Sequence, residues 1–301
     1  MKRIFLLLAG MLSYMSLQAA ETAQLSQTRF TTAEQAADSF VLAVARRDAT
    51  ALNALLGDDY RSVLPIDEIN PDMVDRFLDG WAAFHSLLAL DDSARLLSVG
   101  HKGWTLPIPI VRDSRGWRFD TVAGREMMRV RRIGRNELAV MQAALAYHDA
   151  QIEYASQDRD GDGQLEYARQ FISDPDTHNG LYWEAPAGQP QSPLGPLFSE
   201  KLPTGNYHGY HYRILTAQGE HAPGGAENYL VNGHMTGGFG LIAWPADYGQ
   251  TGVMSFIIGQ NGELYEADLG PETNQLASAI TAFDPDASWS PVAAEFTAAN
   301  L

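Results

Sequence analysis

Residues 123–157 read AGREMMRVRRIGRNELAVMQAALAYHDAQIEYASQ and contain no proline. Apolar side chains recur through this stretch at helical spacing, from Met128 to Ile152. We therefore expect a long helix, with a kink or break near Gly134 and a new helix cap at Asn136. Because segments with strand and turn character lie on both sides, this helix divides the chain into two regions and decides its fold.

The region before this helix has helical patterns first and strand patterns later. A capping box at Thr32 and Gln35 opens one helix, and Pro71 suits the first position of another. Pro107 and Pro109 place the middle strand at an edge or bend it. The expected strands are 94–99, 104–111 and 116–122.

Helices followed by antiparallel strands that end in Gly116-Trp-Arg-Phe-Asp120 form an order similar to the nuclear-transport-factor-2-like fold. The resemblance implies a cone-shaped α+β domain at 31–124, with helices on a curved antiparallel sheet. A pocket in it would lie near Trp81, Phe84, His85, Trp104 and Trp117. An acid–base pair there would be His85 with Asp120 or Asp91. That fold hosts enzymes and binding modules alike, so it leaves the function open.

The region after the helix has mainly strand patterns. A proline- and glycine-rich loop comes first, and Asn232-Gly233 and Asn261-Gly262 are hairpin signals. The expected strands are 207–215, 227–232, 238–244, 253–258 and 264–268.

The globular part of type IV pilins and pseudopilins has a similar order of helix, variable loop and antiparallel sheet. The similar phrases are Gly209-Tyr-His-Tyr-Arg213, Gly240-Leu-Ile-Ala-Trp-Pro245, Gly252-Val-Met-Ser-Phe256 and Gln260-Asn-Gly-Glu263. The resemblance implies a pilin-like α+β domain at 125–301. Pilins begin with their apolar helix directly after a leader, whereas here a whole domain intervenes. Polymerisation through such a helix is therefore not expected, and an adaptor or decoy role fits better.

A candidate metal site follows the helix in the acidic loop 158–166. Its aspartates match positions one, three and five of a calcium-binding loop, and Gly163 matches the glycine at position six. The candidate Ca²⁺ ligands are Asp158, Asp160, Asp162, Gln164 through its backbone carbonyl, and Glu166. Position twelve is Arg169 instead of the usual glutamate. The nearest replacements in sequence are Glu153, Asp174, Asp176 and Glu184. The alternative is a solvated acidic turn without an ion.

The histidines do not predict a zinc site, which needs three or four convergent ligands. His208 and His211 point to opposite faces of an expected strand, and His221 and His234 fall in expected loops. The sequence contains no nucleophile elbow, phosphate loop or dinucleotide fingerprint. We therefore expect no catalytic residues and favour a non-enzymatic protein.

The N-terminus predicts export. Lys2 and Arg3 precede a short apolar run, and a cleavage site lies near Ala19. These features predict a signal peptide at 1–20, a polar leader at 21–30 and a periplasmic or secreted protein. The chain has no cysteine, which excludes disulfides, thiolate metal sites and lipidation at cysteine. Its net charge of -16 disfavours nucleic acid, and no later apolar run is long enough to cross a membrane.

Seven runs across the chain resemble an uncharacterised family of exported bacterial proteins, the domain of unknown function 2950. The runs are Pro107-Ile-Pro-Ile-Val111, Gly116-Trp-Arg-Phe-Asp120, Arg132-Ile-Gly-Arg-Asn-Glu137, residues 158–167, Ser192-Pro-Leu-Gly-Pro196, Arg213-Ile-Leu-Thr-Ala-Gln-Gly219 and Asp268-Leu-Gly-Pro271. This resemblance covers nearly the whole chain and implies no activity.

Together these features predict an exported interaction or structural protein with a calcium-supported loop, for example an accessory to a pilus-like or secretion system. Its partner would be another envelope or secreted protein. The alternative is a small-molecule-binding protein or enzyme that uses the pocket of the N-terminal domain.

Overall fold

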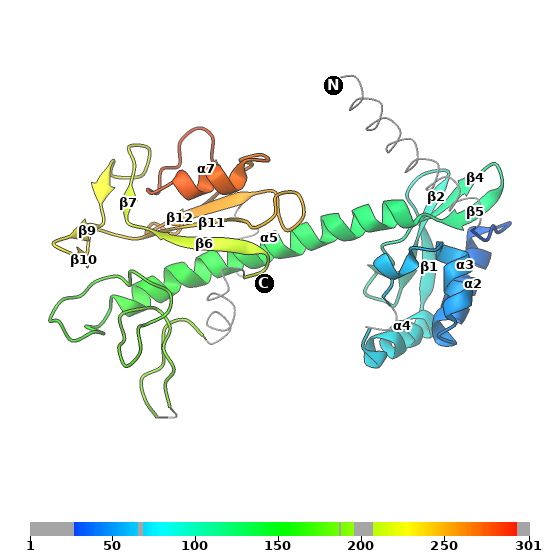
Figure 1. Cartoon of the computed structure of the whole chain (residues 1–301), viewed down its shortest axis with the longest axis horizontal. Coiled ribbons are helices and arrows are strands. Elements are labelled where there is room, and N and C mark those ends of the chain that lie inside the picture. The colour runs from blue at the N-terminus through cyan, green and yellow to red at the C-terminus, as the bar shows by residue number, and fades with distance from the viewer. Residues whose placement is uncertain (1–26, 66–68, 187, 196–206, 294–301) are drawn as a thin grey trace, which may run out of the picture. The chain divides into compact units, whose positions relative to one another are not determined.

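The computed structural model describes residues 27–65, 69–186, 188–195 and 207–293 (Figure 1). The expected signal peptide and most of the leader lie outside these residues. The chain forms two compact units, unit 1 at 1–130 and unit 2 at 131–301. Both units combine helices with antiparallel sheets, which confirms the expected α+β class.

Unit 1 begins with helices whose N-termini are capped by side chains. Helix α2 spans Ala33–Ala45, and the Thr32 side chain accepts a hydrogen bond from the N–H of Gln35. Asn70 caps α4 (Pro71–Ala83) by accepting the N–H of Asp72. Between them lie α3 (Ala49–Leu56) and the short 3-10 helix η1 (Tyr60–Ser62).

The sheet of unit 1 runs in the order β1-β2-β4-β5, and β3 also pairs with β2. Its strands are β1 (His85–Ala89), β2 (Ala94–Val99), β3 (Trp104–Thr105), β4 (Ile110–Asp113) and β5 (Gly116–Phe119). Strand β1 was not expected from the sequence. The single strand expected at 104–111 is wrong, because Pro107 and Pro109 interrupt it and separate β3 from β4. The strand expected to reach residue 122 ends at Phe119, and α5 begins two residues later.

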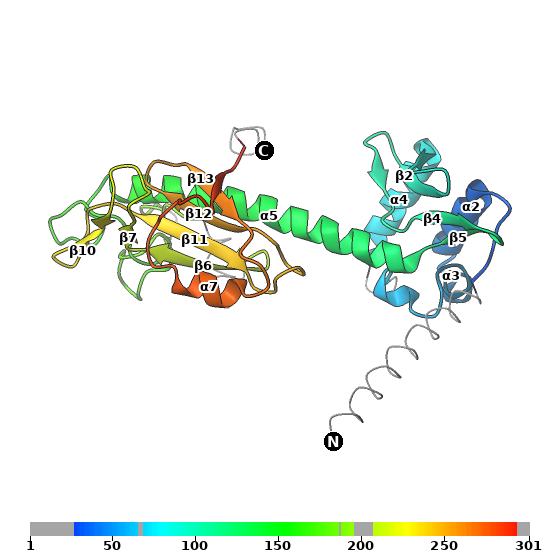
Figure 2. The ribbon, with the colours of Figure 1, turned by 90° about the horizontal axis from the view of Figure 1, so that it is seen from above.

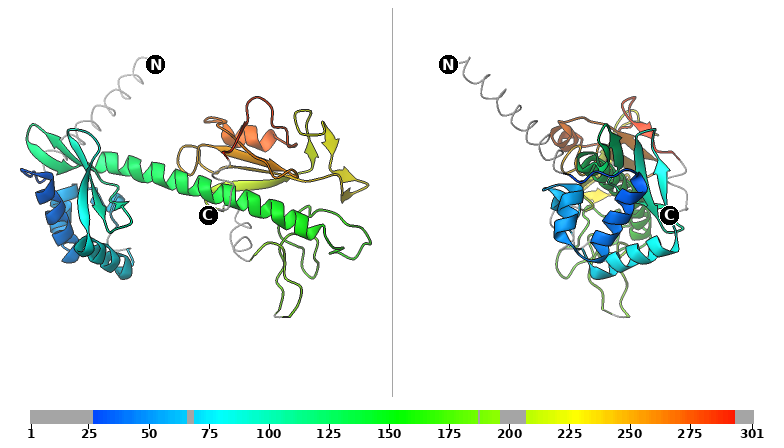
Figure 3. Two further views of the ribbon diagram at one scale, coloured as in Figure 1. Left: turned by 180° about the vertical axis from the view of Figure 1, so that it is seen from behind. Right: turned by 90° about the vertical axis from the view of Figure 1, so that its right-hand side faces the viewer.

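Helices and sheet of unit 1 share one apolar core. The rings of Phe40 on α2 and Phe119 on β5 lie 5.3 Å apart at their centroids. Leu52 of α3, Leu97 of β2 and Ile110 of β4 belong to the same buried cluster. Figure 3 shows these helices next to the strands of the unit.

Helix α5 spans Thr121–Tyr154 without interruption, so the break expected near Gly134 is wrong. A single glycine weakens a helix by only about 0.5–1 kcal/mol relative to alanine. Asn136 does not cap a new helix, because its side-chain Nδ2 donates to the Thr251 carbonyl at 2.7 Å. Among the described helices, α5 included, none combines the length and apolarity that crossing a membrane would require.

The large sheet of unit 2 has the antiparallel order β14-β13-β12-β11-β6. Its strands are β6 (Tyr210–Leu215), β11 (Gly240–Pro245), β12 (Ser255–Gly259), β13 (Leu264–Ala267) and β14 (Ser290–Pro291). The positions of β6, β11, β12 and β13 agree with the expected strands to within a few residues. The edge strand β14 was not expected.

Both faces of this sheet are covered, as the alternation along β11 shows. Leu241 and Ala243 join the cluster that contains Tyr147 of α5. Ile242 and Trp244 point to the other face, into the cluster under α7 (Thr273–Ala279). Figure 1 shows α7 above and α5 below the strands of unit 2, and Figure 2 shows the same strands from above. Because every position of β11 is buried, its sequence lacks the polar alternation of a half-exposed strand.

Two short hairpins extend from unit 2. They are β7 (Ala217–Gln218) with β8 (Glu227–Asn228), and β9 (Leu230–Val231) with β10 (His234–Met235). The turn of the second hairpin is Asn232-Gly233, with φ of 54° and 91°. A two-residue hairpin turn with positive φ at both central residues strongly prefers Asn-Gly, so this predicted hairpin is confirmed.

Candidate metal centre

The acidic loop starts four residues after the end of α5, and the carboxylate of Asp158 organises its first half. Oδ1 of Asp158 accepts the N–H of Gly161 at 2.8 Å, and Oδ2 accepts the N–H of Gly163 at 3.0 Å. Both glycines have positive φ, which lets the chain curl around this carboxylate. The N–H groups of Gly163 and Gly161 lower the pKa of Asp158, because they stabilise its charged form.

The next two aspartates bring their carboxylates to the same place. One side-chain oxygen from each of Asp158, Asp160 and Asp162 lies within 4.8 Å of the other two. All three residues are exposed, and Asp162 Oδ1 also accepts the N–H of Gln164 at 2.8 Å. The loop therefore concentrates negative charge on one surface position.

The second half of the loop is tied to the β9–β10 hairpin. Glu166 is only 8% exposed, and its Oε2 accepts the N–H of Met235 at 2.9 Å. The N–H of Tyr167 donates to the carbonyl of Met235 at 2.8 Å. Arg169, at position twelve of the loop, donates from Nη1 to the carbonyl of Gly233 at 3.1 Å. The residue that replaces the usual calcium ligand thus attaches the loop to the hairpin.

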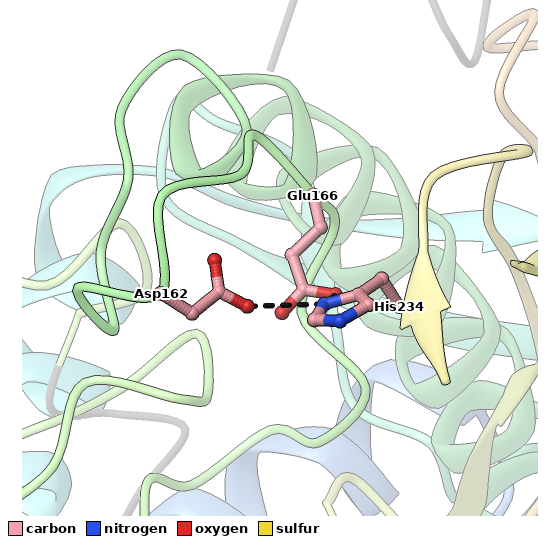
Figure 4. Close-up of side chains that lie close together, drawn as sticks. All are labelled: Asp162, Glu166 and His234. Carbon is pink, nitrogen blue, oxygen red and sulfur yellow. Dashed lines mark ion pairs between the residues drawn. The ribbon is translucent and has the colours of Figure 1, made fainter. Parts of the chain in front are cut away.

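The hairpin also brings His234 to the loop. Nδ1 of His234 lies 3.0 Å from Oδ2 of Asp162 and 3.4 Å from Oε2 of Glu166. Figure 4 shows both carboxylates on the side of the imidazole that faces the loop, with Glu166 entering from the loop and His234 from the strand. Asp162, Glu166 and His234 form a second convergent group, which shares Asp162 with the first.

The structure brings only some of the expected ligands together. The three aspartates converge, whereas Glu166 joins Asp162 only in the second group. The backbone N–H of Gln164 binds Asp162. Within the described residues, neither convergent group includes the four acids nearest in sequence, which are Glu153, Asp174, Asp176 and Glu184. Glu153 instead lies 3.8 Å from Arg159, and Asp174 accepts a hydrogen bond from the Asn179 side chain.

His234 is the site residue that sequence reasoning missed. Its expected position in a loop is wrong, because it begins strand β10. The correctly predicted Asn232-Gly233 turn places it on a hairpin, but no local pattern says which segment that hairpin meets. His221 stands apart from the site, and its Nδ1 lies 3.0 Å from Oδ1 of Asp284, whose carboxylate raises the pKa of the imidazole.

The acid–base pair considered for unit 1 does not form. The His85 ring stacks on Trp81 at 3.7 Å between centroids, and its Nδ1 lies 2.9 Å from the Trp81 carbonyl. Asp91 accepts hydrogen bonds from Ser93, and Asp120 lies 3.6 Å from Arg118. These groups each have local partners, and none of the three lines the apolar cavity that α2 and α4 help to form in this unit.

The donor set suits a hard divalent cation with one exception. Ca²⁺ takes six to eight oxygen ligands, and aspartate and glutamate carboxylates can supply one or two each. Asp158, Asp160, Asp162 and Glu166 provide such oxygens on one loop. The His234 nitrogen is the exception, because imidazole is more typical of transition-metal sites.

A helix that leads through an acidic loop into an antiparallel sheet, with a second α+β unit before it, defines a two-unit α+β protein with a candidate cation site. The family model described as Protein of unknown function (DUF2950) matches residues 27–292, and the chain belongs to this family. The search of curated proteins and the search of solved structures gave no significant match.

Proposed function

We propose that this chain is an exported, non-enzymatic interaction protein whose loop 158–166 binds Ca²⁺. The observation that carries the cation part is the convergence of the Asp158, Asp160 and Asp162 carboxylates within 4.8 Å. In this proposal unit 1 is a nuclear-transport-factor-2-like domain and unit 2 is a pilin-like domain.

Electrostatic repulsion supports a bound cation. Like charges at this separation disfavour each other's ionised form, and a divalent cation removes that cost. The pKa of Asp158 is nevertheless lowered, because two backbone N–H groups hold its carboxylate in the charged form. The backbone thus offsets part of the repulsion at Asp158, and a divalent cation would offset the rest.

Oxygen chemistry favours Ca²⁺ over smaller or softer ions. Mg²⁺ demands near-octahedral geometry and retains several waters, whereas Ca²⁺ accepts irregular sets of carboxylates and carbonyls. In this proposal the Gln164 carbonyl and Glu166 complete the set, and His234 acts as a hydrogen-bond partner of Asp162 and Glu166. The cation then stabilises the docking of the loop on the β9–β10 hairpin.

The interaction role rests on three sequence observations. The N-terminus has the features of an export signal, the sequence has no motif for nucleophilic or nucleotide-dependent catalysis, and unit 2 resembles pilins. A role as an accessory to a pilus-like or secretion system accounts for all three.

Thermal unfolding of the purified chain with EDTA, Ca²⁺, Mg²⁺ or Zn²⁺ tests the cation site. Ca²⁺ should raise Tm, because an ion that binds only the folded state at 100 times its Kd stabilises by about 2.7 kcal/mol. The double substitution Asp160→Ala, Asp162→Ala should abolish the rise. The matched control Glu220→Ala, Glu272→Ala removes two exposed acids of the same unit outside the loop and should retain it. A rise with Zn²⁺ alone, or no rise at all, would contradict the calcium assignment.

Crosslinking in the producing cells tests the interaction role separately. A specific envelope or secreted protein should be recovered with the wild-type chain in the presence of Ca²⁺, and less of it with the double variant. If no partner is recovered from crosslinked envelope fractions, the interaction role fails even when Ca²⁺ binds.

A further inference from the structure

Unit 1 contains an apolar cavity of about 230 Å³. Its walls come from helices α2 and α4, from the segment between β3 and β4, and from Met128 of α5. Phe40, Phe77, Val63, Val74 and Ile108 are among the residues that line it. Among the described residues in the lining, no side chain is charged, and the indole N–H of Trp104 is the only side-chain donor.

The aromatic side chains expected in a pocket of this unit do not fill the cavity. Trp104 lies at its wall, 49% exposed, with its ring edge-on to Phe77 at 6.0 Å between centroids. Met73 of α4 also lines the cavity and is 55% exposed. Trp81 is not part of the lining, because it stacks on His85 instead. Trp104 and Met73, two large and exposed apolar side chains, therefore lie where the apolar cavity opens to solvent.

The size of the cavity limits its ligand. An engineered cavity of about 150 Å³ lined by similar side chains stays dry and binds benzene. By this comparison, the cavity of unit 1 holds roughly nine or ten non-hydrogen atoms. Such a ligand is a medium-length alkyl chain or a two-ring aromatic group.

The surrounding charges favour an uncharged ligand. Helix α4, which supplies Met73, Val74 and Phe77 to the lining, exposes three acids to solvent and one cation, Arg76; the acids are Asp72, Asp75 and Asp79. Arg125 lies one turn before Met128 on α5, but its Nη1 is 3.0 Å from Oδ2 of Asp59. Arg125 thus already has a carboxylate partner, and the three acids of α4 outnumber its one arginine and repel an anionic head group.

We propose that this cavity binds an uncharged hydrocarbon or aromatic compound of about ten non-hydrogen atoms, the size set by comparison with the benzene-binding cavity. The proposal is independent of the cation site in unit 2. It assigns to unit 1 the carriage or sensing of a small apolar compound, with binding driven by burial of apolar surface and not by hydrogen bonds.

Calorimetric titration of the full purified chain with naphthalene, octan-1-ol and octanoate tests the proposal. Naphthalene and octan-1-ol should bind and should raise Tm, whereas octanoate, which has the same chain length and a carboxylate, should bind at least tenfold more weakly. Equal or tighter binding of octanoate would overturn the assignment of an uncharged ligand. Absence of binding by both neutral compounds would overturn the site.

Variants that fill the cavity localise the binding. Met128→Trp and Val63→Phe add volume inside the cavity from two different segments of the chain and should each abolish binding. The matched control Val130→Trp adds comparable bulk on the same helix at a 54% exposed position outside the lining and should bind normally. Circular dichroism selects the filled variant that retains the wild-type fold. Unchanged binding in that variant would overturn the proposal.

Discussion

Nδ1 of His234 lies 3.0 Å from Oδ2 of Asp162, which joins a strand of the β9–β10 hairpin to the middle of the acidic loop. The same nitrogen is 3.4 Å from Oε2 of Glu166, a residue that is 8% exposed. One imidazole thus contacts both carboxylates that connect the loop to the hairpin. This contact is compatible with two roles, as a metal ligand or as a hydrogen-bond partner of metal ligands.

Substitution of His234 separates these roles. We expect His234→Ala to retain the Ca²⁺-dependent rise in Tm, because Ca²⁺ takes oxygen ligands and the carboxylates remain. Asp162→Asn should strongly reduce the rise, since it removes a charge shared by both convergent groups. Thermal unfolding with and without Ca²⁺ checks both variants. A rise that disappears in His234→Ala would make the nitrogen a ligand and favour a transition metal.

Glu166 should contribute to stability even without a cation. In Glu166→Ala, the N–H of Met235 loses the acceptor that it has at 2.9 Å. A buried donor without a partner costs about 1–3 kcal/mol, so urea unfolding in EDTA should show a loss of this size. Glu166→Gln keeps an oxygen acceptor and should lose less stability. Equal losses in the two variants would contradict this account.

The hairpin turn should control the site from a distance. Gly233 has φ of 91°, so Gly233→Ala forces an unfavourable backbone conformation that costs about 1–2 kcal/mol. We expect lower stability in urea and weaker Ca²⁺ binding, because Met235, whose N–H holds the Glu166 carboxylate, follows this turn. Asn232→Gly, at the neighbouring position, accepts positive φ freely and serves as the control. Normal Ca²⁺ binding in Gly233→Ala would show that the loop does not need the hairpin.

The uninterrupted helix α5 predicts a stabilising substitution. A Cβ on Gly134 would meet no atom within 4 Å, and alanine is favoured over glycine inside a helix by about 0.5–1 kcal/mol. Gly134→Ala should therefore raise the free energy of unfolding by that amount. In the same helix, a Cβ on Gly124 would lie 3.1 Å from the carbonyl oxygen of Pro107. Gly124→Ala should thus give no gain, and a gain of equal size at both positions would contradict the packing.

The pair formed by His221 and Asp284 predicts a pH dependence. The Asp284 carboxylate raises the pKa of the imidazole above its ordinary value of 6.5. The stabilisation is therefore fully present below pH 6.5 and is lost as the pH rises through the raised pKa. Asp284→Asn should return the pKa of His221 toward 6.5 and reduce the stability of the folded chain more at pH 5.5 than at pH 9. NMR titration of the imidazole measures the first effect, and urea unfolding at the two pH values measures the second.

Local patterns were sufficient for much of the fold. The Thr32 cap, the Asn-Gly turn and the positions of β6, β11, β12 and β13 follow from interactions within a few residues, which a sequence displays directly. The break expected at Gly134 was wrong because local patterns were not sufficient there. The sequence shows the small local penalty of one glycine, but it does not show that the Asn136 side chain donates to the distant Thr251 carbonyl.

The sequence by itself determined the α+β class, the family and the acidic loop. The loop can be recognised because its alternating carboxylates and glycines occupy consecutive positions. Only the tertiary structure decided that Glu166 becomes buried, that Arg169 attaches to the hairpin and that His234 meets Asp162. The physical reason is that these contacts join segments far apart in the chain. Their geometry depends on how the hairpin packs against the loop, and no local spacing rule contains that information.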